Sequence, residues 1–140
     1  MVPYSKIALL ICALFIIYFG VLFYPRWDKP TTEATIGWDV SGYYSYLPAV
    51  FIYSDLKKAA FLDTIIEKYH PTPDKIQGYN HPSGNFVFKY PMGQALQFLP
   101  WFVIGHTAAA FTNFPQDGFS WPYQAALGGG GFLSPFWDFG

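Results

Sequence analysis

Few side chains in this sequence could do chemistry, and Asp39 stands among aromatic and small polar residues soon after a long uncharged stretch. A carboxylate there can accept a proton, although an aspartate can equally cap the start of a short helix. Lys89 offers a cation for a phosphate, or it is an ordinary basic residue that snorkels at a membrane surface. Tyr43 and Tyr44 could form an interfacial aromatic belt or a platform for a bound ligand.

Three further ionisable residues have simpler interpretations. His81 lies in a turn rich in proline and glycine, where we expect it to be solvated. His106 lies in an apolar segment, so it is either a functional group or a neutral histidine hydrogen-bonded between helices. Asp117 precedes Gly118, and turn chemistry alone explains this pair.

Composition excludes several classes of protein. The formal net charge of −1 gives no electrostatic footprint for nucleic acid. Cys12 is the single cysteine, which excludes an internal disulfide or a cysteine-rich zinc site. Glycine-rich phosphate loops, HExxH and the nucleophile elbow are absent, so nucleotide-dependent soluble chemistry has no support.

The charged residues are unevenly placed. Of eight Lys and Arg, seven lie between Tyr24 and Met92, and so do seven of nine Asp and Glu. The first flank holds the uncharged run Ile7–Tyr24, which as a helix is about 27 Å long and could span a bilayer. A cleaved signal peptide is the alternative, but bulky residues follow the run where a peptidase requires small ones. Flanking charge alone does not decide its orientation.

The polar interval between the flanks, residues 25–91, is expected to form short juxtamembrane elements. Ser54 could cap an amphipathic helix from Asp55 to about Tyr69, or two shorter helices. Prolines end that helix, and a cluster of turn-forming residues, 80–85, then predicts a small hairpin.

The second flank begins with residues 92–111, twenty residues without a formal charge, which we interpret as a second transmembrane helix rather than a buried globular helix. Only sixteen residues follow Gln124, and their four glycines and Pro135 argue against a complete third span. We expect a truncated or frameshifted third helix there, with a short re-entrant or disordered tail as the alternative. The predicted fold is mainly α and integral to the membrane, with two complete transmembrane helices and an incomplete third. Its parts are an amino-terminal segment, a first span, a long polar loop, a second span, a short loop and the truncated helix (1–6, 7–24, 25–91, 92–111, 112–124 and 125–140).

A family resemblance follows from the order of these parts and from a few short motifs. The motifs are Trp38-Asp39 with the tyrosine-rich stretch 43–48, Lys89-Tyr90-Pro91-x-Gly93, and Asp117-Gly118-Phe119-Ser120 before Pro122-Tyr123-Gln124. Residues 1 to about 126 resemble the amino-terminal portion of bacterial polytopic membrane proteins related to the GT-C-fold glycosyltransferases, the superfamily of protein mannosyltransferases and lipid-A aminoarabinose transferases.

The resemblance implies an enzyme of about eight to thirteen helices that takes sugar from a polyprenyl-phosphate donor, in the bacterial inner membrane. It also implies the orientation, with the amino terminus (1–6) in the cytoplasm and the loop 25–91 outside it. It implies Asp39 as the general base, or as a ligand of the acceptor or a divalent metal. The chemistry of the reaction, and not the resemblance, suggests Lys89 for the lipid phosphate and Tyr43 and Tyr44 as substrate-binding residues. We expect this polypeptide to be inactive alone, because two full spans cannot enclose a cavity for the donor lipid. The alternative function is a small, non-enzymatic membrane anchor or assembly subunit.

Overall fold

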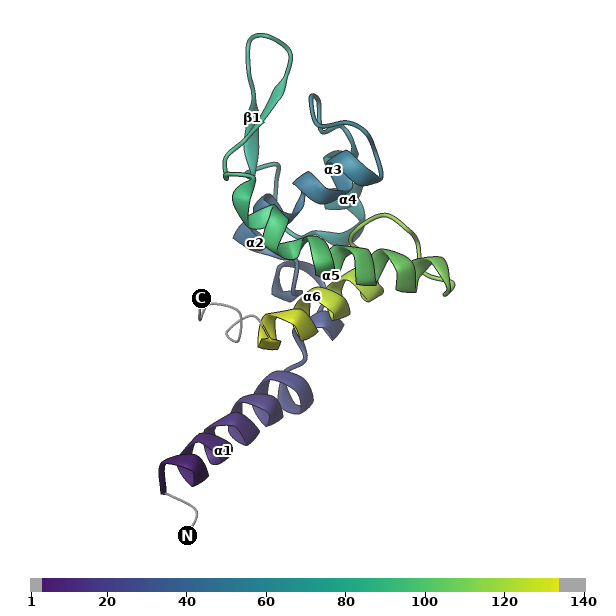
Figure 1. Cartoon of the computed structure of the whole chain (residues 1–140). Coiled ribbons are helices and arrows are strands. Elements are labelled where there is room, and N and C mark those ends of the chain that lie inside the picture. Colours follow the sequence, from purple (N-terminus) through teal and green to yellow (C-terminus); the bar gives the residue numbers. More distant parts are fainter. Residues whose placement is uncertain (1–3, 134–140) are drawn as a thin grey trace.

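The computed structural model of the protein describes residues 4–133, and the predicted fold class is confirmed in that this part is mainly helical. Six α-helices are accompanied, within the described residues, by one π-helical segment, two 3₁₀ turns and one two-stranded hairpin (Figure 1). Their bounds are α1 Tyr4–Ile17, η1 Tyr18–Phe23, η2 Arg26–Asp28, η3 Thr31–Glu33, α2 Trp38–Tyr44, α3 Tyr46–Phe51, α4 Phe61–Tyr69, β1 Gly78–Asn80, β2 Phe86–Phe88, α5 Gly93–Ala110 and α6 Trp121–Leu133.

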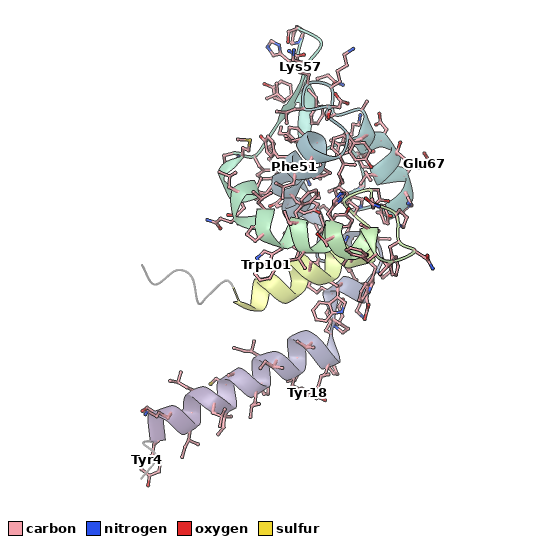
Figure 2. The ribbon with its side chains drawn as sticks, turned by 45° about the vertical axis from the view of Figure 1, so that its right-hand side comes forward. Tyr4, Tyr18, Phe51, Lys57, Glu67 and Trp101 are labelled. Carbon is pink, nitrogen blue, oxygen red and sulfur yellow. The ribbon has the colours of Figure 1, made fainter. Side chains whose placement is uncertain are left out.

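Helix α1 continues directly into η1, and together they project away from the rest of the molecule (Figures 1 and 2). None of their residues is buried by another element. Within the described residues, this is the single helix that is long and apolar enough to cross a membrane, by length and composition. A secretory signal sequence shares these two properties.

Helix α5 has the position and length expected of the second span but is less apolar than α1. It carries Gln94, Gln97, Pro100 and His106, and it does not reach the hydropathy expected of a membrane span. The proposed second crossing at residues 92–111 is therefore not confirmed by composition.

The body of the molecule is built around the crossing of α5 with α6, and α2 and α3 pack on α5 (Figure 1). Its core is aromatic: the Tyr44 ring lies 6.0 Å from Phe102 and 5.5 Å from Phe119, measured between centroids. Gly105 allows the two helices to approach, because a β-carbon there would lie 2.8 Å from the Cα of Tyr123. Each of the three rings, Tyr44, Phe102 and Phe119, is buried, and large aromatic rings bury more apolar surface than most side chains.

Helix α4 corrects one prediction, because it begins at Phe61 and not at Asp55. The Asp55 carboxylate accepts the backbone N–H groups of Lys58 and Ala60, at 3.0 and 2.7 Å, and so closes a separate turn. Ala59 then adopts a left-handed conformation with φ +47°, which a continuous α-helix does not allow. Helix α4 is amphipathic as predicted, and its apolar side chains Leu62 and Ile65 are buried in the core.

The predicted hairpin is present as an antiparallel pair in which Gly78 faces Phe88 and Asn80 faces Phe86. The His81 N–H donates to the Asn85 carbonyl oxygen at 2.8 Å and closes the loop. Gly84 adopts φ +81° in that loop, a conformation in which glycine carries no β-carbon penalty.

Helix α6 shows that the glycine run does not prevent a helix, contrary to expectation. The helix starts at Trp121, before the predicted boundary at residue 125, and continues to Leu133 through all four glycines. Packing against α5 and η2 stabilises it, and such tertiary contacts override weak intrinsic propensity. The predicted third span extends to residue 140, and its last part, 134–140, lies outside the described residues, as do residues 1–3 of the predicted cytoplasmic amino terminus.

Candidate functional site

Asp39 is positioned by the way α2 begins. Trp38 adopts φ +48°, an unusual conformation for a bulky residue, and its N–H donates to the Pro71 carbonyl oxygen at 2.9 Å. Its own carbonyl oxygen accepts the Ser41 hydroxyl at 2.6 Å and the Gln77 side-chain amide at 2.7 Å. These contacts fix the first turn of α2 against two distant segments, and with it the direction of Asp39.

Three of the four predicted site residues lie together around a residue that was not predicted, Tyr90. The Tyr90 hydroxyl donates to Asp39 Oδ1, and the Tyr43 ring lies 4.4 Å from the Tyr90 ring, between centroids. The Lys89 ammonium lies 5.2 Å from the same ring centroid. We call Asp39, Tyr43, Lys89 and Tyr90 the Asp39 cluster.

Gly42 makes room for the Asp39 cluster. A β-carbon at Gly42 would lie 2.4 Å from Tyr90 Cδ2 and 2.6 Å from Gln77 Oε1, both far inside normal contact distance. Gln77 is buried, and its Oε1 is one of two buried side-chain atoms without a hydrogen-bond partner in the described part of the chain. Tyr90 and Gln77 therefore cover α2 at a position where only glycine fits.

The electrostatics of the cluster favour a neutral tyrosine beside an open carboxylate. The hydrogen bond to Asp39, followed by desolvation, raises the pKa of the Tyr90 hydroxyl, so Tyr90 remains a donor at physiological pH. Asp39 is exposed, and the structure gives it this one side-chain partner, on Oδ1. Its second oxygen has no hydrogen-bond partner in the described part of the chain and is available to another donor.

Tyr44, the fourth predicted site residue, lies elsewhere. It is fully buried, and its hydroxyl donates to the Gly118 carbonyl oxygen at 2.7 Å. Burial raises the pKa of this hydroxyl well above its ordinary value. Tyr44 is thus part of the core in this structure, whereas the tyrosine beside Asp39 is Tyr90, which adjoins Lys89 in one of the motifs noted in the sequence.

Asp117 has a larger structural part than its turn suggests. Its carboxylate accepts the Lys68 ammonium at 2.9 Å, the Tyr69 hydroxyl at 2.5 Å, and the backbone N–H groups of Phe119 and Ser120 at 3.0 Å each. The turn itself is present, with Gly118 at φ +87°. Asp117 therefore joins α4 to the segment that leads into α6.

Two histidines follow the simpler of their interpretations. The His106 Nδ1 lies 2.6 Å from the Tyr123 hydroxyl oxygen, which hydrogen-bonds α5 to α6. His81 is exposed in the hairpin loop, where it contacts Ser83.

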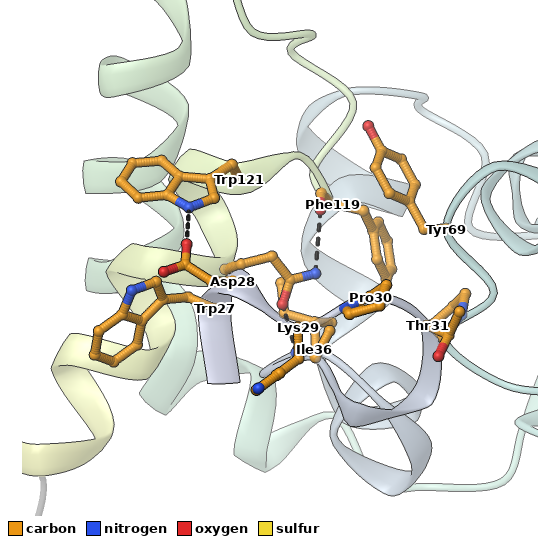
Figure 3. A pocket seen from close by; sticks show the side chains of 12 residues that line it. Trp27, Asp28, Lys29, Pro30, Thr31, Ile36, Tyr69, Phe119 and Trp121 are labelled. Atoms are coloured by element: carbon orange, nitrogen blue, oxygen red, sulfur yellow. Dashed lines mark hydrogen bonds between the residues drawn. The ribbon is translucent and has the colours of Figure 1, made fainter. Parts of the chain in front are cut away.

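A pocket of about 270 Å³ lies where the chain leaves η1 and enters the body of the molecule, and none of the residues of the Asp39 cluster lines it (Figure 3). It is formed by η2, η3 and the start of α6. Its lining residues are Trp27, Asp28, Lys29, Pro30, Thr31, Ala34, Ile36, Tyr69, Pro71, Phe119, Trp121 and Gln124.

A divalent metal does not fit the residues that the structure brings together. Between residues 4 and 133 there is no group of three or more His, Cys, Asp and Glu side chains that could hold an ion. Asp39 has a tyrosine and a lysine as neighbours, and neither is a ligand that Mg²⁺ or Ca²⁺ prefers.

No family model, curated protein or solved structure matches the chain.

Proposed function

We propose that this chain is the amino-terminal part of a membrane glycosyltransferase that takes sugar from a polyprenyl-phosphate donor, with the Asp39 cluster in its active site. One observation carries the proposal. A carboxylate, two tyrosine rings and a lysine, drawn from segments about fifty residues apart, gather on one surface. These are the groups that glycosyl transfer from a lipid phosphate requires.

The chemistry follows from the arrangement of the cluster. The Asp39 carboxylate, oriented by Tyr90, takes the proton of the acceptor hydroxyl as its oxygen bonds to the anomeric carbon. The bond from that carbon to the donor phosphate breaks, and the phosphate leaves with the electron pair. Lys89 stabilises the negative charge on the departing phosphate. The ring of Tyr43 supplies an apolar surface for the sugar. No step requires a metal.

A membrane location supports this function, because a polyprenyl donor is confined to the bilayer. In the proposal α1 and η1 form the first span, α5 the second and α6 the start of the third, in a bacterial inner membrane. Helix α5 is about 27 Å long and has an exposed apolar stripe, which suits contact with lipid. The stripe is formed by Leu96, Pro100, Val103, Ile104 and Phe111.

The test is Asp39→Ala in the complete gene, with transfer of labelled sugar from polyprenyl phosphate measured in isolated membranes. Loss of general-base catalysis predicts a fall in rate of about 10²–10⁴-fold. Asp63→Ala is the matched control, because this aspartate is exposed and its ion-pair partner, Lys75, is not a member of the cluster. Unchanged transfer by the Asp39 variant would remove the catalytic role, and measurable transfer by the purified 140-residue chain would show that it is active alone.

The stripe on α5 also favours a second function, a non-enzymatic anchor or assembly subunit whose apolar face packs on a partner. The DNA sequence downstream of residue 127 distinguishes the transferase from the assembly subunit. Several further apolar spans encoded downstream of residue 127 in any frame would favour the transferase, and none would favour the subunit.

A further inference from the structure

Two tryptophans and a carboxylate line one side of the pocket at the end of η1. We call Trp27, Asp28 and Trp121 the aromatic entrance. Figure 3 shows the indole rings of Trp27 and Trp121 on opposite sides of the Asp28 side chain. The Trp121 Nε1–H donates to Asp28 Oδ1 at 2.7 Å, which holds one ring against the carboxylate. A carboxylate with indole rings beside it is suited to an organic cation, which pairs with the charge of Asp28 and gains cation–π attraction where it lies over the face of a ring; the N–H edge of Trp121 serves to hold the carboxylate.

The position of Trp27 is set by α6. A β-carbon at Gly128 would lie 2.7 Å from Cε3 of the Trp27 ring, so this indole packs against the helix where a side chain is absent. The floor of the pocket is apolar and includes the buried Ile36 and Phe119. The aromatic entrance is therefore built on the body of the molecule.

The charges around the pocket cancel. Arg26 and Lys29 are matched by Asp28 and Glu33, so the segment 26–33 has no net charge. The Arg26 Nε–H donates to the Glu33 carbonyl oxygen at 3.3 Å, and the Tyr24 hydroxyl donates to Glu33 Oε2 at 2.7 Å. A ligand with one positive and one negative group complements this surface better than a simple anion does.

The two charges that line the pocket face different neighbours. Asp28 lies between the indoles, whereas the Lys29 ammonium lies 4.3 Å from the centroid of the Tyr24 ring, at the end of the apolar run. Tryptophan and tyrosine favour the headgroup level of a bilayer. With α1 in the membrane, the lysine would meet lipid phosphates while the carboxylate lies further into the body.

From these observations we propose that the pocket binds the headgroup of a zwitterionic phospholipid. The alkylammonium group lies against Asp28 between Trp27 and Trp121, and the phosphodiester lies toward Lys29. The acyl chains run along the exposed apolar surface of α1 and η1. This site is independent of glycosyl transfer at Asp39 and requires only that α1 lie in a bilayer.

The experiment compares lipids of identical acyl chains on the full chain in detergent, with bound lipid counted by native mass spectrometry. Phosphatidylethanolamine and phosphatidylcholine are expected to bind at least tenfold more tightly than phosphatidylglycerol. Asp28→Asn keeps an oxygen for the Trp121 indole but removes the charge, and it is expected to abolish this preference. Asp63→Asn, which changes an exposed aspartate outside the pocket, is expected to keep it.

Trp121→Phe provides a second variant should Asp28→Asn unfold, because it keeps a ring but loses the indole N–H and much of the cation–π attraction. It too is expected to lose the preference, with an unchanged circular dichroism spectrum. Equal or tighter binding of phosphatidylglycerol, or a preference retained in both variants, would overturn the proposal.

Water-soluble glycerophosphoethanolamine separates a lipid site from a site for a free zwitterion. It is expected to bind at least tenfold more weakly than the lipid, because it lacks the chains that contact α1. Equal affinity would assign the pocket to a soluble ligand and overturn the lipid proposal.

Discussion

Asp39 and Asp117 have the same side chain in opposite surroundings. Asp117 receives four donors and is 15% exposed, whereas Asp39 is exposed and receives one side-chain donor. A carboxylate whose oxygens are all engaged holds structure together, and one with a free oxygen can accept a proton from a substrate. The sequence suggested a turn for Asp117 but could not show its contacts with α4, because those partners lie about fifty residues away.

Asp117→Ala should therefore destabilise the fold. It leaves Tyr69 and two backbone N–H groups without their acceptor, and we expect the free energy of unfolding to fall by about 2–4 kcal/mol. Urea or thermal unfolding followed by circular dichroism measures this change. Asp63→Ala serves as the control and should alter stability by less than about 0.5 kcal/mol, because its ion pair is exposed. A loss of under about 1 kcal/mol for Asp117→Ala would contradict the structural role.

Alkaline pH should destabilise the fold through Tyr69. Burial, followed by the hydrogen bond to Asp117, raises the pKa of this hydroxyl to about 12. Since the folded state holds the proton more tightly than the unfolded chain, the stabilisation is complete below about pH 10 and is lost as pH rises toward 12. Tyr69→Phe should flatten this part of the stability profile, and an unchanged slope would show that Tyr69 does not contribute.

At the scale of elements, the sequence pattern predicted correctly those elements that are determined by interactions between residues close in the chain. The hairpin and the apolar stripe of α4 are where alternation, turn residues and helical periodicity placed them. The start of α4 and the glycine-rich helix α6 were not predicted correctly from the sequence pattern. The Asp55 carboxylate accepts backbone N–H groups in a separate turn, so α4 begins later. Packing against α5 stabilises α6, although its glycines have low intrinsic helix propensity.

The crossing of α5 and α6 can be tested with a matched pair of glycines in one helix. Gly105→Ala places a β-carbon 2.8 Å from the backbone of Tyr123, so the helices must separate, at a cost of about 1–3 kcal/mol. At Gly93 a β-carbon meets nothing within 4 Å, and Gly93→Ala should be neutral or slightly stabilising. The melting temperatures of both variants, measured by thermal unfolding, test this prediction, and Gly105→Ala should melt at the lower temperature. Equal melting temperatures would mean that the helices do not meet closely at Gly105.

At the scale of the whole molecule, the sequence identified three members of the Asp39 cluster but not the residue that joins them. Between Asp39 and Tyr90 the chain forms α3, α4 and the hairpin, and the meeting of the two residues depends on tertiary contacts such as the Gln77 amide on the Trp38 carbonyl oxygen. Tyr44 lies apart from the cluster, in the buried core. A tyrosine at a membrane surface and one in an aromatic core look alike in sequence, and burial alone separates them.

The location of α1 decides whether this body works at a membrane, and Cys12 is a natural probe for it. This sole cysteine lies about 8 Å inside the apolar run that starts at Ile7, and no other element of the described structure buries it. Membranes opened by freeze–thaw would be treated with a water-soluble maleimide before and after SDS. A double variant, Cys12→Ser with Ser83→Cys, moves the thiol to the exposed hairpin loop and reports full aqueous access.

A helix in lipid predicts no labelling of Cys12 in membranes resistant to carbonate extraction and full labelling after SDS, whereas the double variant is labelled under both conditions. Full labelling of Cys12 before SDS, or release of the chain by carbonate, would contradict a membrane-spanning α1. No label even after SDS would show that the segment had been cleaved as a signal sequence.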